Sequence, residues 1–186
     1  MGQLTLLLGG ARSGKSTYAL RLAHEHGGQV VFVATAQPGD QEMVARIKAH
    51  QDQRPSQWLT LESPIRVAES WRAHQMQADI AILDCLTFLV TNLILQAAED
   101  IDQPDEALAE NLVREEIDSL LELIEATPNS WIIVSNEVGL GLVPPYPLGR
   151  VFRDNLGWAN QRLAGASSEV YLLVAGIPVP IHTYRK

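Results

Sequence analysis

The sequence has only one cysteine, Cys85, among its 186 residues, and this excludes an intrachain disulfide bond. A chain without disulfides is typical of a reducing compartment, so we expect a cytoplasmic protein. Basic residues are also scarce, because 14 Lys and Arg stand against 22 Asp and Glu and give a formal net charge of −8. That balance argues against a partner such as nucleic acid or an anionic membrane surface, although it leaves room for a local basic pocket.

Long apolar runs are missing as well. The first residues lack a basic segment, and the run at residues 4–8 is too short for a signal peptide or a membrane span. No internal repeat and no low-complexity segment is evident. We therefore expect one domain over residues 1–186, with a full-sized core and no membrane span.

Short apolar runs alternate with helical patterns along the chain. The runs are residues 4–8, 29–34, 80–83, 131–135 and 169–174. Runs rich in Val, Ile and Leu that are separated by helices predict an α/β fold with a mostly parallel central sheet and helices on both faces. Residues 105–126 predict one long amphipathic helix. Residues 139–149, with three prolines and three glycines, predict an irregular loop, and residues 176–181 predict a turn into an edge strand.

The most specific motif lies directly after the first apolar run and matches the phosphate-binding pattern G-x-x-x-x-G-K-[ST] at every fixed position. Its residues are Gly9, Gly10, Ala11, Arg12, Ser13, Gly14, Lys15 and Ser16. Backbone N–H groups of such a loop and the following helix N-terminus bind phosphate oxygens. Lys15 can then reach the β- and γ-phosphates, and the Ser16 hydroxyl can ligate Mg²⁺. The motif predicts a P-loop NTPase-like (RecA-like) fold that binds a nucleoside triphosphate.

Polar residues at the carboxyl ends of the predicted strands are further candidates, because ligands of open parallel sheets bind there. The second run ends in Ala34, Thr35 and Ala36. Asp84 follows the third run, where a Walker-B acid would hold Mg²⁺, although Asp is also a good helix N-cap. The neighbouring Cys85 is expected to be a small core residue rather than a nucleophile.

The fourth run is followed by Asn136 and Glu137. Glu137 could orient a nucleophile or a water near the γ-phosphate, and a capping or ion-pairing role is nearly as plausible.

A second chemical feature is His50, near the end of a predicted short helix over residues 41–51. By itself, a histidine at the carboxyl end of a helix is more often a cap than a catalyst, and the helix dipole favours the imidazolium form, which is not nucleophilic. Arg54 lies close by in the sequence; its charge would oppose that effect, and it could bind phosphate.

These segments together resemble one family, the bifunctional adenosylcobinamide kinase / adenosylcobinamide-phosphate guanylyltransferases. The similarity includes the phosphate loop, residues 34–36, and a group made of Arg46, Ile47, His50, Asp52, Arg54, Pro55 and Trp58. It continues in order through residues 90–93, segments within 136–144, residues 152–154 and residues 160–164. The resemblance therefore extends over nearly the whole chain and is far more specific than a phosphate loop alone.

The resemblance implies two reactions at one nucleotide site. In the first, a hydroxyl of adenosylcobinamide attacks the γ-phosphate of ATP or GTP. In the second, His50 takes GMP from GTP as a phosphoramidate and passes it to the corrinoid phosphate, which gives adenosylcobinamide-GDP in cobalamin (vitamin B12) biosynthesis. The preceding residue, often a second histidine in relatives, is Ala49 here, which leaves His50 as the single candidate.

The resemblance also implies the ligands and the assembly. Nucleotide contacts are expected from Gln51, Asp52, Gln53 and Arg54, and Glu62 is expected to accept hydrogen bonds from guanine. The implied ligands are GTP, ATP and Mg²⁺, and the implied assembly is a homotrimer with the corrinoid between subunits. Two other classes stay open: a monofunctional P-loop small-molecule kinase, which would leave His50 idle, and a nucleotide-gated interaction protein.

Overall fold

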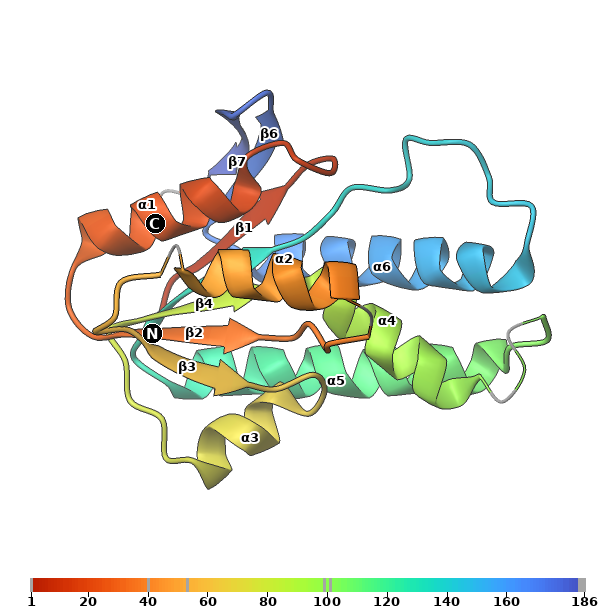
Figure 1. Cartoon of the computed structure of the whole chain (residues 1–186), viewed down its shortest axis with the longest axis horizontal. Helices are drawn as coiled ribbons and strands as arrows, with labels where there is room; N and C mark the ends of the chain where they lie inside the picture. The colour runs from red at the N-terminus through yellow and green to blue at the C-terminus, as the bar shows by residue number, and fades with distance from the viewer. Residues whose placement is uncertain (1, 40, 53, 99, 101, 184–186) are drawn as a thin grey trace.

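The computed structural model describes residues 2–39, 41–52, 54–98, 100 and 102–183. A seven-stranded sheet runs through the centre in the order β3-β2-β4-β5-β1-β6-β7 (Figure 1). The strands are β1 (Leu4–Leu8), β2 (Val30–Ala34), β3 (Leu59–Glu62), β4 (Ile80–Asp84), β5 (Ser130–Val134), β6 (Glu169–Val174) and β7 (Ile177–Thr183). All neighbouring pairs are parallel except β6 with β7. The predicted α/β, P-loop NTPase-like architecture with a mostly parallel sheet is confirmed.

Helices connect the strands and cover both faces of the sheet. They are α1 (Lys15–His26), α2 (Gln41–Asp52), α3 (Val67–Ala73), α4 (Leu86–Ala97), α5 (Glu106–Ala126) and α6 (Pro147–Ala166). Helix α1 packs on one face, and α3 to α6 pack on the other. In Figure 1, α2 lies on the same side of the sheet as α1, above the ends of β2 and β4. A parallel sheet covered on both sides explains why its strands read as continuous apolar runs.

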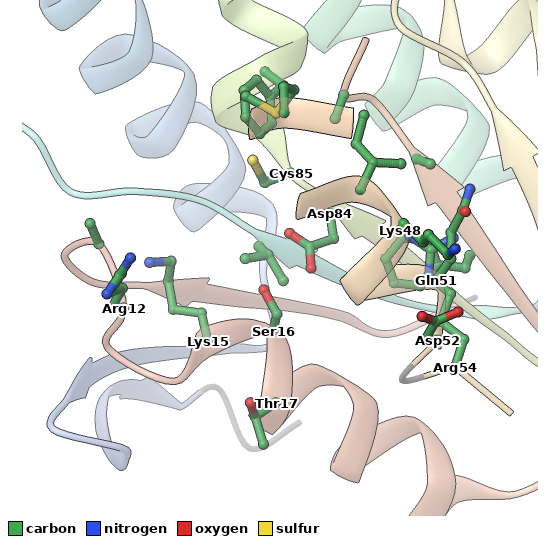
Figure 2. Close-up of a pocket in the computed structure, with 18 of the residues that line it drawn as sticks. Arg12, Lys15, Ser16, Thr17, Lys48, Gln51, Asp52, Arg54, Asp84 and Cys85 are labelled. Atoms are coloured by element: carbon green, nitrogen blue, oxygen red, sulfur yellow. The ribbon is translucent and has the colours of Figure 1, made fainter. Parts of the chain in front are cut away.

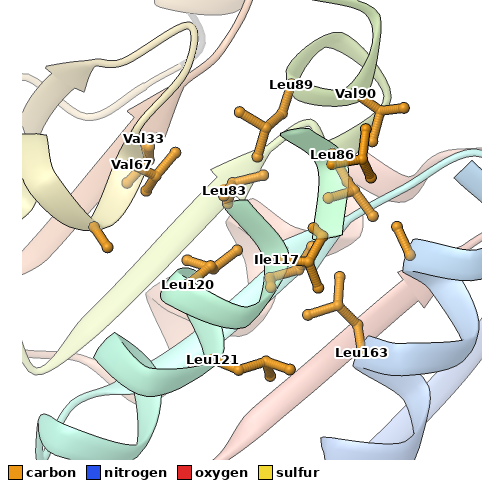
Figure 3. Packing of buried hydrophobic residues seen from close by; sticks show 14 of the residues in the cluster. Val33, Val67, Leu83, Leu86, Leu89, Val90, Ile117, Leu120, Leu121 and Leu163 are labelled. Atoms are coloured by element: carbon orange, nitrogen blue, oxygen red, sulfur yellow. The ribbon is translucent and has the colours of Figure 1, made fainter. Parts of the chain in front are cut away.

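The strands divide their side chains between two cores with the period of two that a pleated strand requires. In β1, Leu4, Leu6 and Leu8 join the larger core under α3 to α6, whereas Leu7 joins the smaller core under α1. Figure 3 shows the larger core where Leu83 of β4 meets Leu120 of α5. This packing fixes the strand ends at one edge of the sheet.

Helix α5 agrees with the amphipathic helix predicted from the sequence. The Asp105 carboxylate caps its start by accepting a hydrogen bond from Leu108 N–H at 2.9 Å. One acid of α5 lies on the buried side. The Glu116 carboxylate accepts the backbone N–H groups of Arg66 at 2.7 Å and Val67 at 2.8 Å, at the start of α3. Burial raises the pKa of Glu116, and the two hydrogen bonds oppose that shift.

The structure differs from the sequence prediction in two places. Strand β3 was not predicted, because Leu61 is its only buried residue and a half-exposed edge gives no apolar run. The irregular loop predicted over 139–149 ends early, since α6 begins at Pro147. Proline is well suited to the first turn of a helix, where its missing N–H has no partner to lose.

The carboxyl-terminal end of the sheet agrees with the prediction of a turn into an edge strand. Strand β7 pairs antiparallel with β6 and contains Pro178 and Pro180, as an edge position allows. Among the described residues, no helix combines the length and apolar character that crossing a membrane requires.

Candidate active site

A cavity of about 860 Å³ opens at the carboxyl edge of the sheet, between the phosphate loop and α2. Figure 2 shows Lys15 and Ser16 at one end of it, Arg54 and Asp52 at the other, and Asp84 between them. Most of the predicted site residues that the structure describes line this cavity. They are Ala11, Arg12, Ser13, Gly14, Lys15, Ser16, Ala34, Ala36, Gln51, Asp52, Arg54, Glu62 and Asp84.

The phosphate loop has a backbone that only certain residues can adopt. Gly9 and Gly14 have φ angles of 149° and 94°, and Arg12 is left-handed at 57°. A Cβ added at Gly9 would lie 2.5 Å from the carbonyl oxygen of Leu173, so no other residue fits at that position without a shift of the backbone. The two glycines of the motif are therefore required by the loop itself.

The loop is also held by segments that are distant in the sequence. Gly176, in the turn between β6 and β7, donates its N–H to the Ser13 carbonyl at 2.9 Å. Glu137, after β5, donates its N–H to the Gly9 carbonyl at 3.2 Å. Sequence reasoning missed the role of the carboxyl-terminal hairpin, because no motif marks a backbone contact.

Lys15 is buried within this loop, with 7% of its surface exposed. Its ammonium group donates to the Gly9 carbonyl at 2.9 Å and to the Gly10 carbonyl at 2.7 Å. Burial lowers the pKa of Lys15, and the acidic groups of Cys85 and Asp84 oppose that shift. A partly desolvated cation at the head of a helix is suited to bind phosphate, since little water screens its charge.

Asp84 is the last residue of β4 and faces the cavity. Figure 2 shows its carboxylate and the Ser16 hydroxyl pointing toward one another. The N-cap residue of α4 is Cys85, without a side-chain cap bond, so the alternative interpretation of Asp84 as an N-cap is wrong. No cluster of three or more His, Cys, Asp or Glu suited to a metal occurs in the described residues. One carboxylate and one hydroxyl suit Mg²⁺, which takes its other ligands from phosphates and water.

Thr35 and Cys85 connect the ends of β2 and β4. The buried Thr35 hydroxyl donates to the Cys85 carbonyl at 2.7 Å and accepts the Cys85 N–H at 2.9 Å. Thr35 therefore supports the cavity wall from behind, while Ala34 and Ala36 line it. Burial, followed by the charge of Asp84, raises the pKa of the Cys85 thiol to about 11. The thiol is protonated near neutral pH, in keeping with the expectation that it is not a nucleophile.

Arg54 is the main cation at the α2 end of the cavity. Its guanidinium carbon lies 3.6 Å from the centroid of the Phe32 ring, which holds the group flat against β2. Its Nε is buried and has no hydrogen-bond partner among the described residues, and Nη1 makes only a 3.5 Å contact with Thr60. Burial lowers the pKa of Arg54, and Asp84 and Glu62 oppose that shift. An N–H group that lacks a partner here is available to an anion.

Two predicted residues fall partly or wholly outside the described part of the chain. His50 belongs to α2, but its side chain is not described, and Gln53 is outside the described residues altogether. The helix that carries His50 contributes Met43, Val44, Ile47, Lys48 and Gln51 to the cavity wall.

Two residues that follow β5, Asn136 and Glu137, have different contacts in the structure. Asn136 lines the cavity, and sequence reasoning gave it no role. The Glu137 carboxylate accepts the N–H of Gly139 at 2.6 Å, so it closes its own turn. This local capping role was the alternative to orienting a nucleophile. Both residues stand at a polar strand end, and only the tertiary structure distinguishes between them.

Comparisons with known proteins agree with this geometry. A family model described as "Cobinamide kinase / cobinamide phosphate guanyltransferase" matches residues 5–181. The chain is 43% identical over 176 residues to the bifunctional adenosylcobalamin biosynthesis protein CobP of Pseudomonas aeruginosa, and the match covers 95% of each chain. It is 42% identical over 187 residues to the protein of the same description, CobU, of Salmonella typhimurium, and 41% over 181 residues to that of Escherichia coli. These two matches cover 96% of this chain and 99% of each relative.

Proposed function

This chain belongs to the cobinamide kinase / cobinamide phosphate guanyltransferase family, and we propose that it phosphorylates adenosylcobinamide and then transfers GMP to the product. It is a transferase of cobalamin biosynthesis with a kinase and a nucleotidyltransferase activity. The phosphoryl donor of the first reaction is ATP or GTP, and GTP is the GMP donor of the second.

One observation carries the proposal: a single cavity is lined at one end by the phosphate loop and at the other by α2. Kinase chemistry uses the first end to hold the triphosphate. A nucleotidyltransferase also needs a nucleophile or an acceptor at the α-phosphate, and the helix of His50 supplies the second wall. A monofunctional kinase would leave His50 of that helix idle.

In the kinase reaction, the hydroxyl oxygen of adenosylcobinamide forms a bond to the γ-phosphorus, and the bond to the bridging oxygen of the nucleoside diphosphate breaks. The loop amides and Lys15 hold the phosphates in line and stabilise their charge, which is the main requirement of phosphoryl transfer. Ser16 and Asp84 would hold Mg²⁺, whose charge would offset that of the phosphate oxygens.

In the transferase reaction, an imidazole nitrogen of His50 forms a bond to the α-phosphorus, and pyrophosphate leaves. An oxygen of the corrinoid phosphate then forms a bond to the same phosphorus, and the bond to His50 breaks. This covalent route divides one displacement into two and requires a neutral imidazole. Glu62 would accept hydrogen bonds from guanine and so select GTP.

The remaining parts of the proposal concern the assembly and its place in the cell. We take residues 1–186 as one functional domain, and the family resemblance supports a homotrimer that binds the corrinoid between subunits. A single cysteine supports a reducing, cytoplasmic location.

The test is incubation with Mg²⁺ and GTP labelled at the α-phosphate, followed by mass analysis of the intact protein. We expect one covalent GMP per chain, stable to base and labile to acid as a phosphoramidate is. Addition of adenosylcobinamide phosphate should discharge the label into adenosylcobinamide-GDP. Corrinoid phosphorylation without a covalent label would favour the monofunctional kinase. Nucleotide binding without corrinoid-dependent turnover would favour the nucleotide-gated interaction protein.

A further inference from the structure

Strand β5 lies between the two strands that carry the phosphate-binding groups. Val134 is paired with Leu7 of β1 on one side and with Asp84 of β4 on the other. Asn136 follows two residues later, at the carboxyl edge of the sheet. Val134 and Asn136 both line the cavity. Asn136 thus stands between the phosphate loop and Asp84.

The backbone of Asn136 is held on both sides by side chains. Its N–H donates to the Thr87 hydroxyl at 3.1 Å, and its carbonyl accepts from Asn160 Nδ2 at 3.0 Å. Asn160 is itself fixed by the buried Ser135 hydroxyl, which donates to Asn160 Oδ1 at 2.6 Å. Satisfied polar networks of this kind define one geometry, because each member loses a hydrogen bond if it moves.

The side chain of Asn136, in contrast, makes no hydrogen bond to any residue within the described ranges. Asn136 is half-buried and lines the cavity. A fixed backbone with an available side-chain amide is the arrangement expected of a preorganised ligand contact.

We infer that Asn136 is a further catalytic residue of the kinase reaction, and that its Nδ2–H donates a hydrogen bond to an oxygen of the γ-phosphate. This inference rests on the proposed function. An amide supplies donors at Nδ2 and does not take up a proton near neutral pH, so Asn136 stabilises charge and is not a base. The γ-phosphate is the phosphate nearest to Lys15 and Asp84 in a nucleotide bound to this motif.

The step is balanced without any further group. The hydroxyl oxygen of adenosylcobinamide bonds to the γ-phosphorus, and the bond to the β,γ-bridging oxygen breaks with its electron pair on the nucleoside diphosphate. The hydroxyl proton passes to a phosphate oxygen and then to water. During the transfer Asn136 shares with Lys15 the charge of the γ-phosphoryl oxygens. The GMP transfer takes place at the α-phosphate, where Asn136 has no part.

Activity gives the first test. The kinase is assayed with ATP and adenosylcobinamide, and GMP transfer is assayed separately with GTP and adenosylcobinamide phosphate. Asn136→Ala should lower the kinase kcat roughly 100-fold, as loss of one oriented donor does, and leave the kcat of GMP transfer at saturating GTP within about twofold. Asn136→Asp keeps the shape but replaces the donor by a negative charge, so its kinase kcat should fall at least as far. Asn111→Ala removes an exposed asparagine of α5 that does not line the cavity; it is the matched control and should keep the kinase rate.

Binding gives a second test that needs no corrinoid. The probes are GTP and GDP analogues with a methylene group between the α- and β-phosphorus; the P–C bond does not break, so no GMP is transferred from them. We expect Asn136→Ala to lower the affinity for the triphosphate analogue about tenfold and to leave the affinity for the diphosphate analogue nearly unchanged. Calorimetry measures both affinities.

The outcomes are distinguishable from a failure of the proposed function. If the wild-type protein lacks both activities, the proposed function is wrong. The ratio of its affinities for the two analogues, compared with the ratio in Asn136→Ala, still decides the role of Asn136. An unchanged ratio in Asn136→Ala overturns the inference. Equal loss of kinase and transferase activity also overturns it, because that result indicates a structural role.

Discussion

The two ends of the cavity are built in different ways. At the loop end, Lys15 is 7% exposed and donates to two carbonyl groups, and the loop is tied to β5 and to the β6–β7 turn. At the other end, none of the α2 side chains that the structure describes is buried, and Val44 is 51% exposed. Burial and hydrogen bonding fix the first end, whereas α2 rests on the protein through half-buried side chains.

This difference fits the two reactions assigned to the site. Phosphoryl transfer at the γ-phosphate depends on groups that are in place before the substrate binds, which a rigid loop provides. In the proposed route of GMP transfer, His50 first approaches the α-phosphate and then passes GMP to the corrinoid phosphate. A helix with few buried contacts can adjust at small cost in free energy, because little packing is lost when it moves. The contrast is open to four experiments.

The largest effect is expected from His50→Ala. Without the imidazole no phosphoramidate forms, so GMP transfer and covalent labelling should fall about 10⁴-fold or more. The kinase rate should stay within a few fold, because γ-transfer needs no protein nucleophile. Label incorporation and the two separate assays measure this split. His24→Ala, an exposed histidine of α1, is the control. A label that persists in His50→Ala, or that is found on Lys15, would contradict the assignment.

Lys15→Ala and Asp84→Asn remove groups that the two proposed reactions share. Both reactions need the triphosphate held in place, so each variant should lose about 2–4 kcal/mol of transition-state stabilisation in kinase and transferase alike. The measurement is kcat/KM for both reactions. Arg21→Ala removes one positive charge from the same helix at an exposed position and should change neither. Wild-type rates in either site variant would break the shared-site model.

A matched pair of isoleucines tests the structural half of the comparison. Ile117 of α5 is fully buried in the larger core, whereas Ile47 of α2 is half-buried. Ile117→Ala should lower the free energy of unfolding by about 3 kcal/mol, and Ile47→Ala by less than about 1 kcal/mol. Urea unfolding followed by circular dichroism gives both values. Equal losses would mean that α2 is as firmly packed as α5.

The smallest effect concerns guanine selection at the α2 end. Glu62 ends β3 and lines the cavity with an exposed side chain. Glu62→Ala should narrow the preference of the transferase for GTP over ATP about tenfold, or about 1.4 kcal/mol, since an acceptor for the guanine N–H groups is lost. Competition between the two nucleotides measures the ratio. Glu69→Ala, an exposed acid of α3, is the control, and an unchanged ratio in Glu62→Ala would place guanine recognition elsewhere.

Much of the fold could be predicted because its signals are local. Strands β1 and β6 have the bounds of their apolar runs, and the long helix α5 starts one residue after its Asp105 cap. The glycines of the phosphate loop could also be predicted, because their backbone angles require glycine. Strand β3 was missed because its stability comes from pairing with β2 at the sheet edge and not from its own composition.

By itself, the sequence determined the elements that depend on near neighbours: the phosphate loop, the buried strands and the position of Asp84 at the end of β4. The tertiary structure decided which distant groups meet. It placed Arg54 on the Phe32 ring, used Thr35 to join two strand ends, and distinguished Asn136 from Glu137. The physical reason is that a local conformation depends on residues a few positions apart, whereas a side-chain contact depends on the strand order and register of the folded chain.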